Sequence, residues 1–192
     1  KSRIKSSIKS SVENHIRVLN DSNLQINIER IVTNSIEAFK NDKKMFFCGN
    51  GGSASDAQHI ASELSGRFYK DRPPLYAEAL HVNSSYMTAV ANDYGYEETY
   101  ARMVEASGRK GDVLVGISTS GNSPNVVKAM LNAKEIGMLT VGFTGSKGGK
   151  MKEICDIMIQ VPSDDTPRIQ EVHILVGHII CQLIEEEMFP NA

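Results

Sequence analysis

The sequence lacks the features that mark several large classes of protein. Its three cysteines, Cys48, Cys155 and Cys181, never form a CxxC pair and lie in apolar surroundings, which favours reduced core thiols over disulfides or a zinc knot. The 21 lysines and arginines do not exceed the 23 aspartates and glutamates, so a basic surface for nucleic acid or anionic membranes is not expected. We find no signal peptide and no apolar run of membrane-spanning length. We therefore expect a cytoplasmic protein that binds neither nucleic acid nor membrane.

Two nucleotide-binding patterns are also missing. Neither glycine-containing loop, at residues 49–52 and 118–125, ends in the GK[ST] of a Walker A sequence, and no GxGxxG occurs. A nucleoside triphosphate or a dinucleotide is therefore disfavoured as ligand. The longest acidic run, Glu185 to Glu187, closes a predicted helix just before Phe189 and Pro190. We expect this run to be solvated and without function.

The chain is long enough for one well-buried core, with 192 residues of which 41% are hydrophobic. We expect a single domain over residues 1–192, made of a helical pair (1–42) and an α/β core (43–192). An amphipathic first helix is predicted by apolar residues at three- and four-residue steps, and a second helix follows over 24–39. These helices could pack on the sheet or on another subunit, and we favour an oligomer contact for at least one. The apolar positions of the first are Ile4, Ile8, Val12, Ile16 and Leu19.

Apolar runs of strand length alternate with helical patterns along the rest of the chain. Strands are predicted at 45–48, 76–80 (weakly), 113–117, 139–143 and 157–161. Helices are expected after the first strand, at about 84–92 and 97–106, from Pro124, and from about Pro167 to Glu187. Such alternation predicts a parallel sheet covered on both faces, a three-layer α/β sandwich. Ligands of such sheets bind beyond the carboxyl ends of the strands.

The first strand leads into a glycine-rich loop and a helix that carries chemistry. Gly49, Gly51 and Gly52 allow positive φ and close approach of a ligand. We expect Ser53, Ser55 or Asp56 to cap the following helix. His59 and Glu63 are four residues apart, so both side chains lie on one face of that helix. Taken without the adjoining loop, this pair is better explained as an exposed ion pair than as a site.

A second loop of the same kind follows the strand at 113–117. It reads STSGNSPN and is rich in hydroxyl groups that suit phosphate. Gly121 frees the backbone, and Pro124 fits the first helical position, which leaves neighbouring N–H groups for an anion. A flexible turn with a helix cap is the alternative. The position directly after a buried strand favours phosphate binding.

These motifs together resemble a known family. GNGGSASDAQHIASE, AND at 91–93, STSGNSPN and TPRIQEVHILVGHIICQLIE are similar to the sugar-isomerase (SIS) domain and, within it, to the phosphoheptose isomerases. The resemblance covers nearly the whole chain. It implies a five-stranded, flavodoxin-like core and a homotetramer with active sites at subunit interfaces. It also implies conversion of sedoheptulose 7-phosphate to D-glycero-D-manno-heptose 7-phosphate, the first step of activated-heptose synthesis for lipopolysaccharide core or capsule.

The resemblance further implies the site residues, and this chain departs from the family at none of them. Zinc, one ion per subunit, would be held by His59, Glu63, Gln170 and His178. Glu63 and His178 would be the base and acid of an enediol mechanism. Substrate contacts would be made by Asn50, Gly51, Gly52, Glu63, Asn92, Asp93, Ser118, Thr119, Ser120, Ser123 and Gln170.

Helix geometry complicates that ligand set. Gln170 and His178 are eight residues apart, about 12 Å along a helix axis and roughly 80° around it. Three alternatives follow: the helix bends, a neighbouring subunit supplies one residue, or His178 is an acid or base and not a tight ligand. His173, His15 and His81 lie outside the motif and are predicted to be structural.

Two other functions remain open from the sequence. A non-catalytic SIS scaffold, similar to the proteins that associate with a replication initiator, has no need of the His59, Glu63, Gln170 and His178 set. A pentose-phosphate isomerase or sugar-phosphate sensor shares the serine loop but usually carries extra regulatory or DNA-binding domains, for which 192 residues leave no room.

Overall fold

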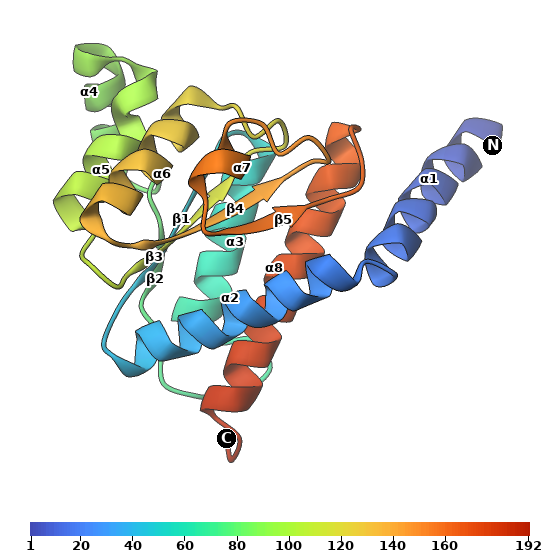
Figure 1. Ribbon diagram of the computed structural model, residues 1–192, viewed down its shortest axis with the longest axis horizontal. Coiled ribbons are helices and arrows are strands. Elements are labelled where there is room, and N and C mark those ends of the chain that lie inside the picture. Colours follow the sequence, from blue (N-terminus) through green and yellow to red (C-terminus); the bar gives the residue numbers. More distant parts are fainter.

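The computed structural model describes residues 1–192 and has a five-stranded sheet enclosed by helices (Figure 1). The strands are β1 Met45–Gly49, β2 Ala77–Ala79, β3 Val113–Ile117, β4 Leu139–Thr144 and β5 Ile157–Gln160. The helices are α1 Ser2–Leu19, α2 Ser22–Lys40, α3 Gly52–Ser65, α4 Ser84–Tyr94, the 3₁₀ turn η1 Tyr96–Glu98, α5 Thr99–Ser107, α6 Pro124–Ile136, α7 Met151–Ile154 and α8 Thr166–Met188.

All neighbouring strands are parallel, and their order is β2-β1-β3-β4-β5. β1 and β3 are buried along their whole length, as continuous apolar runs require in a sheet covered on both faces. The weak strand prediction at 76–80 corresponds to the three-residue edge strand β2. The chain reverses its direction of winding between β1 and β3, and their carboxyl ends form the crevice in which such sheets bind ligands.

The strands alternate their side chains between two cores. Phe47 and Val115 pack with α2, α3 and α8 on one face of the sheet. Phe46, Cys48 and Leu114 point the other way and pack with α5, α6 and α7. Figure 1 shows the resulting helix, sheet and helix layers. The predicted three-layer α/β sandwich is therefore confirmed.

Two helices differ in local detail from the sequence predictions. Three residues expected to cap α3 do not: Ser53, Ser55 and Asp56 already lie inside the helix, because Gly51, at φ +57°, is the N-cap residue. Glycine has no side chain, so α3 begins without a side-chain cap. The short helix α7 was not predicted. It is only four residues long and has no amphipathic period of its own.

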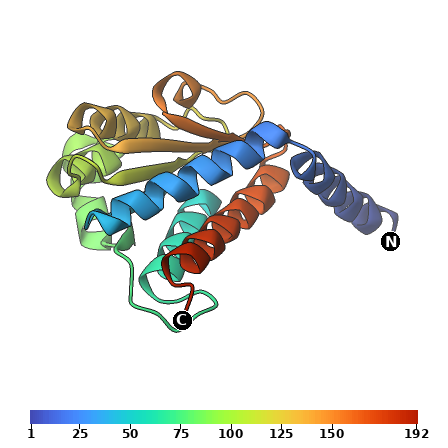
Figure 2. The same cartoon turned by 60° about the horizontal axis from the view of Figure 1, so that its bottom comes forward.

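The first helix stands apart from the rest of the molecule. α1 projects from the body and contacts mainly the beginning of α8 (Figure 2). Its predicted apolar stripe is exposed: Ile8 is 59% and Leu19 70% accessible. The equivalent stripe on α2 is buried, with Ile31 fully covered. None of the helices has the length and apolar character needed to cross a membrane.

The prediction that the glutamates at 185–187 are solvated is wrong for Glu185. Its side chain is 2% exposed and pairs with the Arg72 guanidinium, which is fully buried, at 3.0 Å. Burial tends to raise the pKa of this carboxyl, but hydrogen bonds from the N–H groups of residues 68–70 and from Arg72 lower it below its usual value. The remaining two glutamates of the run, Glu186 and Glu187, are not buried.

Candidate active site

The loops after β1 and β3 are joined side by side at the carboxyl edge of the sheet. Asn50 and Asn125 exchange side-chain amide hydrogen bonds, each of 2.9 Å. Tyr96 donates its hydroxyl to Asn50 Oδ1 at 3.0 Å. Asn125 is almost completely buried. The amide of Asn50 is therefore held in one orientation at the mouth of the crevice.

The serine loop is organised by its own hydroxyl groups. Ser118 Oγ lies 2.8 Å from Ser123 Oγ and 3.4 Å from Ser120 Oγ. Ser120 Oγ accepts the N–H of Asn122. Pro124 occupies the first helical position of α6, as predicted. Hydroxyls and a helix N-terminus thus converge in the way that binds phosphate. A pocket of about 250 Å³ adjoins the loop and is lined by Thr119, Ser120, Asn122, Ser146, Lys147, Asp164, Thr166 and Ile169.

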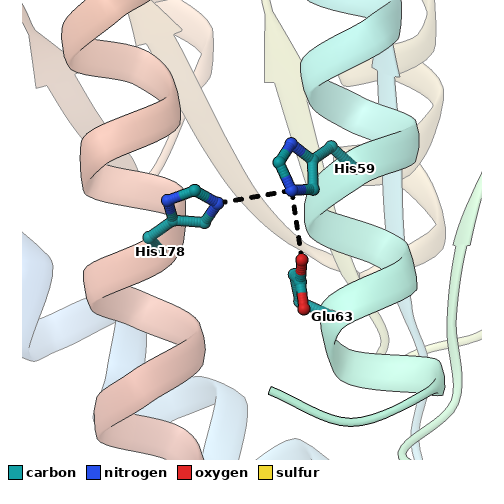
Figure 3. A group of neighbouring side chains, drawn as sticks. All are labelled: His59, Glu63 and His178. Carbon is teal, nitrogen blue, oxygen red and sulfur yellow. Dashed lines mark hydrogen bonds and ion pairs between the residues drawn. The ribbon is translucent and has the colours of Figure 1, made fainter. Parts of the chain in front are cut away.

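Three of the predicted metal ligands converge between α3 and α8. His59 and Glu63 extend from α3 toward His178 on α8 (Figure 3). His59 Nε2 lies 3.1 Å from Glu63 Oε1 and 3.4 Å from His178 Nε2. One ligand atom from each residue lies within 4.8 Å of the other two. The three side chains form a compact cluster, which we call the His59/Glu63/His178 cluster.

The spacing of this cluster fits a zinc ion. Zn–N bonds of about 2.05 Å at tetrahedral angles separate neighbouring ligand atoms by about 3.3 Å. Two of the three separations, 3.1 and 3.4 Å, are close to that value, and the third, between Glu63 and His178, is within 4.8 Å. Two imidazoles and one carboxylate, with His59 still 48% exposed, match the three protein ligands and open position of catalytic zinc sites.

Gln170 does not join the cluster within the chain. Its side chain lies against Gly52, where a Cβ atom would be 2.6 Å from Gln170 Nε2. Gly52 precedes His59 by seven residues, about 10 Å along α3. α8 is an uninterrupted α-helix from Thr166 to Met188. Gln170 is therefore placed beside the glycine loop, on the side where the substrate contacts are predicted.

The other predicted substrate contacts lie near the two loops or at the end of α4. Gly51 and Gly52 form the turn into α3. Asn92 donates to Asp93 Oδ1 at 2.8 Å in the last turn of α4, and both residues are exposed. The next glycine, Gly95, lines a pocket of about 480 Å³ together with Asn50, Tyr96, Glu97, Ser123, Pro124 and Asn125.

The histidines outside the motif are separate from the cluster. His173 is fully buried on α8, its Nε2 is 3.2 Å from Thr144 O, and burial lowers its pKa to about 4. His15 bonds within its own helix, to Ser11 O at 2.8 Å. Burial lowers the pKa of His81. None of the three is among the clustered ligands.

Several residues at the site were not found from the sequence. Phe68 lies beside the cluster, with its ring centroid 5.7 Å from that of His178. Asp56 precedes His59 by one turn of α3, and one of its carboxylate oxygens is buried without a hydrogen-bond partner. Burial raises the pKa of Asp56 to about 6, although the nearby His59 acts to lower it. The i, i+3 spacing of Asp56 and His59 already places both side chains on one face of the helix, so Asp56 could have been found from the sequence. The positions of Phe68 and Tyr96 depend on tertiary packing.

Comparison with known proteins identifies the family of the chain. The SIS domain family matches residues 10–145. A phosphoheptose isomerase of Aneurinibacillus thermoaerophilus is 52% identical over 188 residues, 98% of this chain and 95% of that protein. The solved phosphoheptose isomerase of Neisseria gonorrhoeae superposes with a TM-score of 0.91 at 39% identity, covering 96% of this chain and 98% of the other. That of Francisella tularensis gives 0.93 at 36%, covering 96% and 97%.

Proposed function

The chain belongs to the phosphoheptose isomerases of the SIS domain family, and from that membership we propose that it converts sedoheptulose 7-phosphate to D-glycero-D-manno-heptose 7-phosphate. The product would supply activated heptose for lipopolysaccharide core or capsule, in the cytoplasm. The observation that carries the proposal is the His59/Glu63/His178 cluster on helices that begin at the crevice edge of the sheet. A non-catalytic scaffold gives no reason for this cluster, and the similarity to named isomerases disfavours it.

The residues of the site fit the needs of aldose–ketose isomerisation. A proton must leave C1 of the ketose and return at C2 through an enediol, while protons also move at the two oxygens. Glu63 directs Oε1 at His59, which leaves Oε2 to take the proton from C1 and return it at C2. If His178 is not a zinc ligand, it would donate a proton to the carbonyl oxygen. The serine loop holds the phosphate, and Asn50, Asn92, Asp93 and Gln170 position the sugar hydroxyls.

A zinc ion is the proposed cofactor. His59, Glu63 and His178 would hold it, and when bound it would polarise the carbonyl as a Lewis acid. Gln170 of the same chain lies about two helical turns away. If Gln170 is also a ligand, either α8 bends when the ion binds or a second copy of the chain supplies Gln170. Within one chain we assign Gln170 to the substrate.

Turnover with and without metal tests this function. Purified protein is incubated with sedoheptulose 7-phosphate, and the heptose aldose is followed by NMR with added zinc or with chelator. We expect activity that chelation abolishes and zinc restores. Activity indifferent to chelator would keep the isomerase and remove the metal from the mechanism. No turnover under any metal condition, from folded protein, would favour the scaffold.

The role of His178 requires its own variant. A His178→Ala protein that keeps one zinc per subunit but loses turnover would identify His178 as an acid or base. Loss of zinc would identify it as a ligand. Unchanged turnover would remove His178 from the mechanism. Zinc content by atomic absorption and kcat from the NMR assay distinguish the three outcomes.

We also propose a homotetramer with active sites at its interfaces. The support is the apolar stripe of α1, whose five residues are 51–70% exposed: Ile4, Ile8, Val12, Ile16 and Leu19. An apolar groove of about 460 Å³ lies between α1, α2 and α8, and stripe residues Val12, Ile16 and Leu19 line part of it. A second copy of the chain would cover both surfaces. Light scattering after gel filtration should give a tetramer for the wild type and a smaller species for Ile8→Lys, and a wild-type monomer would contradict the proposal.

A further inference from the structure

The segment between α3 and β2, Gly66–Arg72, is fastened to α8 by a buried carboxylate. Glu185 Oε1 accepts the backbone N–H groups of Tyr69 at 2.7 Å and Lys70 at 2.8 Å. Its Oε2 accepts the N–H of Phe68 at 3.1 Å. Three consecutive amides converge on one side chain. The path of this segment past α8 is therefore set by Glu185.

Arg72 fastens the same segment to the end of α3. Its Nε donates to Glu185 Oε2 at 3.0 Å, and Nη2 donates to the carbonyl of Glu63 at 2.8 Å. Nη1 donates to the carbonyls of Leu64 and Gly66. These are among the last carbonyls of α3, which have no partner within the helix. Arg72 thus satisfies them and joins the turn that carries Glu63 to α8.

The segment also forms a wall beside the His59/Glu63/His178 cluster. The ring of Phe68 lies 5.7 Å from that of His178, at an interplanar angle of 33°. The N–H of Phe68 is one of the three that Glu185 holds. Glu185 itself follows His178 by seven residues, two turns of the same helix. One carboxylate therefore acts on two of the cluster's residues, on His178 through Phe68 and on Glu63 through Arg72.

We propose that Glu185 and Arg72 are positioning residues of the His59/Glu63/His178 cluster, and that they act by fixing the Gly66–Arg72 segment, with Phe68 against His178 and Glu63 in register with α8. The proposal deepens the proposed function, because it concerns the same metal site. Stability alone does not explain the pair, since well-packed apolar side chains often replace a buried ion pair without loss. Here Arg72 donates to the carbonyls of Glu63 and Leu64 at the end of α3, and Glu185 lies on α8, the helix that carries His178.

Zinc affinity tests this proposal directly. The variants are Glu185→Gln, which removes the charge and one acceptor oxygen, and Arg72→Lys, which keeps a cation but loses the forked donors. Zinc binding to the metal-free full chain is measured by competition with a chromophoric chelator. Loss of groups that orient metal ligands typically costs about 10–100-fold in affinity. We expect at least a tenfold loss in both variants.

Asp112→Asn is the matched control. Asp112 is buried to the same extent as Glu185, at 1% exposure. It also accepts two backbone N–H groups, from Lys44 at 2.9 Å and Arg109 at 2.8 Å, but at the beginning of β3, the opposite end of the strand from the crevice. It should lower the melting temperature without changing zinc affinity more than about twofold. Equal losses of affinity in Asp112→Asn and Glu185→Gln would overturn the proposal, as would wild-type affinity in Arg72→Lys.

A milder variant keeps the proposal falsifiable if Glu185→Gln fails to fold. Phe68→Leu leaves the backbone hydrogen bonds to Glu185 in place and removes only the ring against His178. Tyr69→Leu is its control, because Tyr69 is 69% exposed and its ring contacts Phe68 and not the cluster. Zinc affinity should fall several-fold in Phe68→Leu and stay unchanged in Tyr69→Leu. Equal affinities in the two variants would contradict the role given to Phe68.

The readout separates this proposal from the isomerase itself. A wild-type chain that binds zinc but does not convert sedoheptulose 7-phosphate would refute the proposed function, while the affinities of the variants would still decide the positioning role. If the wild-type chain turns over substrate without binding zinc, kcat is measured in place of zinc affinity, with the same variants and controls. A chain that does neither would overturn both.

Discussion

Gly177 allows α3 and α8 to approach closely at the level of the metal cluster. A Cβ atom at Gly177 would lie 2.4 Å from Ile60 Cδ1 and 2.6 Å from Ile60 Cγ1. Ile60 is 1% exposed, so its side chain has little room to move. Gly177 precedes His178, and Ile60 follows His59. This pair packs closely at the level of α3 and α8 where the two imidazoles lie 3.4 Å apart.

Substitution of Gly177 by alanine therefore has two opposing effects. Alanine in a helix interior is favoured over glycine by about 1 kcal/mol. Forcing an extra methyl group into a packed core costs about 1–3 kcal/mol. We expect a net loss of stability of about 0–2 kcal/mol in Gly177→Ala. In an Ile60→Ala background, itself destabilised by about 2–5 kcal/mol, the contact is gone, and the same substitution should stabilise by up to about 1 kcal/mol.

Urea unfolding of the four proteins in this double-mutant cycle measures the effect. Protein and zinc concentrations are held constant, because association and metal binding both shift apparent stability. The expected result is a change of sign of the Gly177→Ala effect between the two backgrounds. Equal effects in both would refute the view that Ile60 is the side chain that requires glycine at 177. A zinc affinity reduced in Gly177→Ala and restored in the double variant would agree with helix separation as the cause.

Three further predictions concern pH, substrate and metal. The pKa of His173 is about 4 in the folded chain and about 6.5 when unfolded; the unfolded state therefore gains the proton first, and stability should fall by about 3 kcal/mol as pH drops from about 6.5 to about 4. His173→Gln, which keeps a donor for Thr144 O, should flatten that part of the wild-type stability profile, and parallel profiles would contradict this. Tyr96→Phe, which removes the hydrogen bond to Asn50, should raise KM by about two- to tenfold with an unchanged melting temperature, and an unchanged KM would remove Tyr96 from the site. Zinc at about 100 times its Kd should raise the unfolding free energy of the wild type by about 2.7 kcal/mol and that of His59→Ala by far less, as measured by urea titration; equal gains would place the zinc elsewhere.

Much of the fold was predictable because parallel strands buried on both faces appear as continuous apolar runs. All five predicted strands are present. The loops after the first and third strands could then be assigned to the carboxyl edge, where the structure joins them through Asn50 and Asn125. The contact between the two amides was not predictable, because it links residues 75 positions apart.

Glu185 shows where reasoning from local pattern fails. Three consecutive glutamates near a helix end are usually solvated, and nothing within the run distinguishes the first of them. Its charge is compensated by Arg72, which lies 113 residues earlier, between two predicted elements. Burial of a charge depends on partners that are distant in the chain. A buried acid at such a position can therefore be recognised only once the packing of α3 and α8 is known.

The exposed apolar stripe of α1 lies close to one part of the candidate active site. The same three- and four-residue period predicted both leading helices, but only α2 buries its stripe within the chain. α1 is held to the beginning of α8, where Ser11 donates to Glu171 at 2.7 Å and Asn14 donates to the carbonyl of Arg168 at 3.1 Å. These two α8 residues flank Gln170. A second copy that covers the stripe of α1 would thus lie close to the turn of α8 that carries Gln170, so the surface that needs a partner and the residue left outside the metal cluster belong to one region of the molecule.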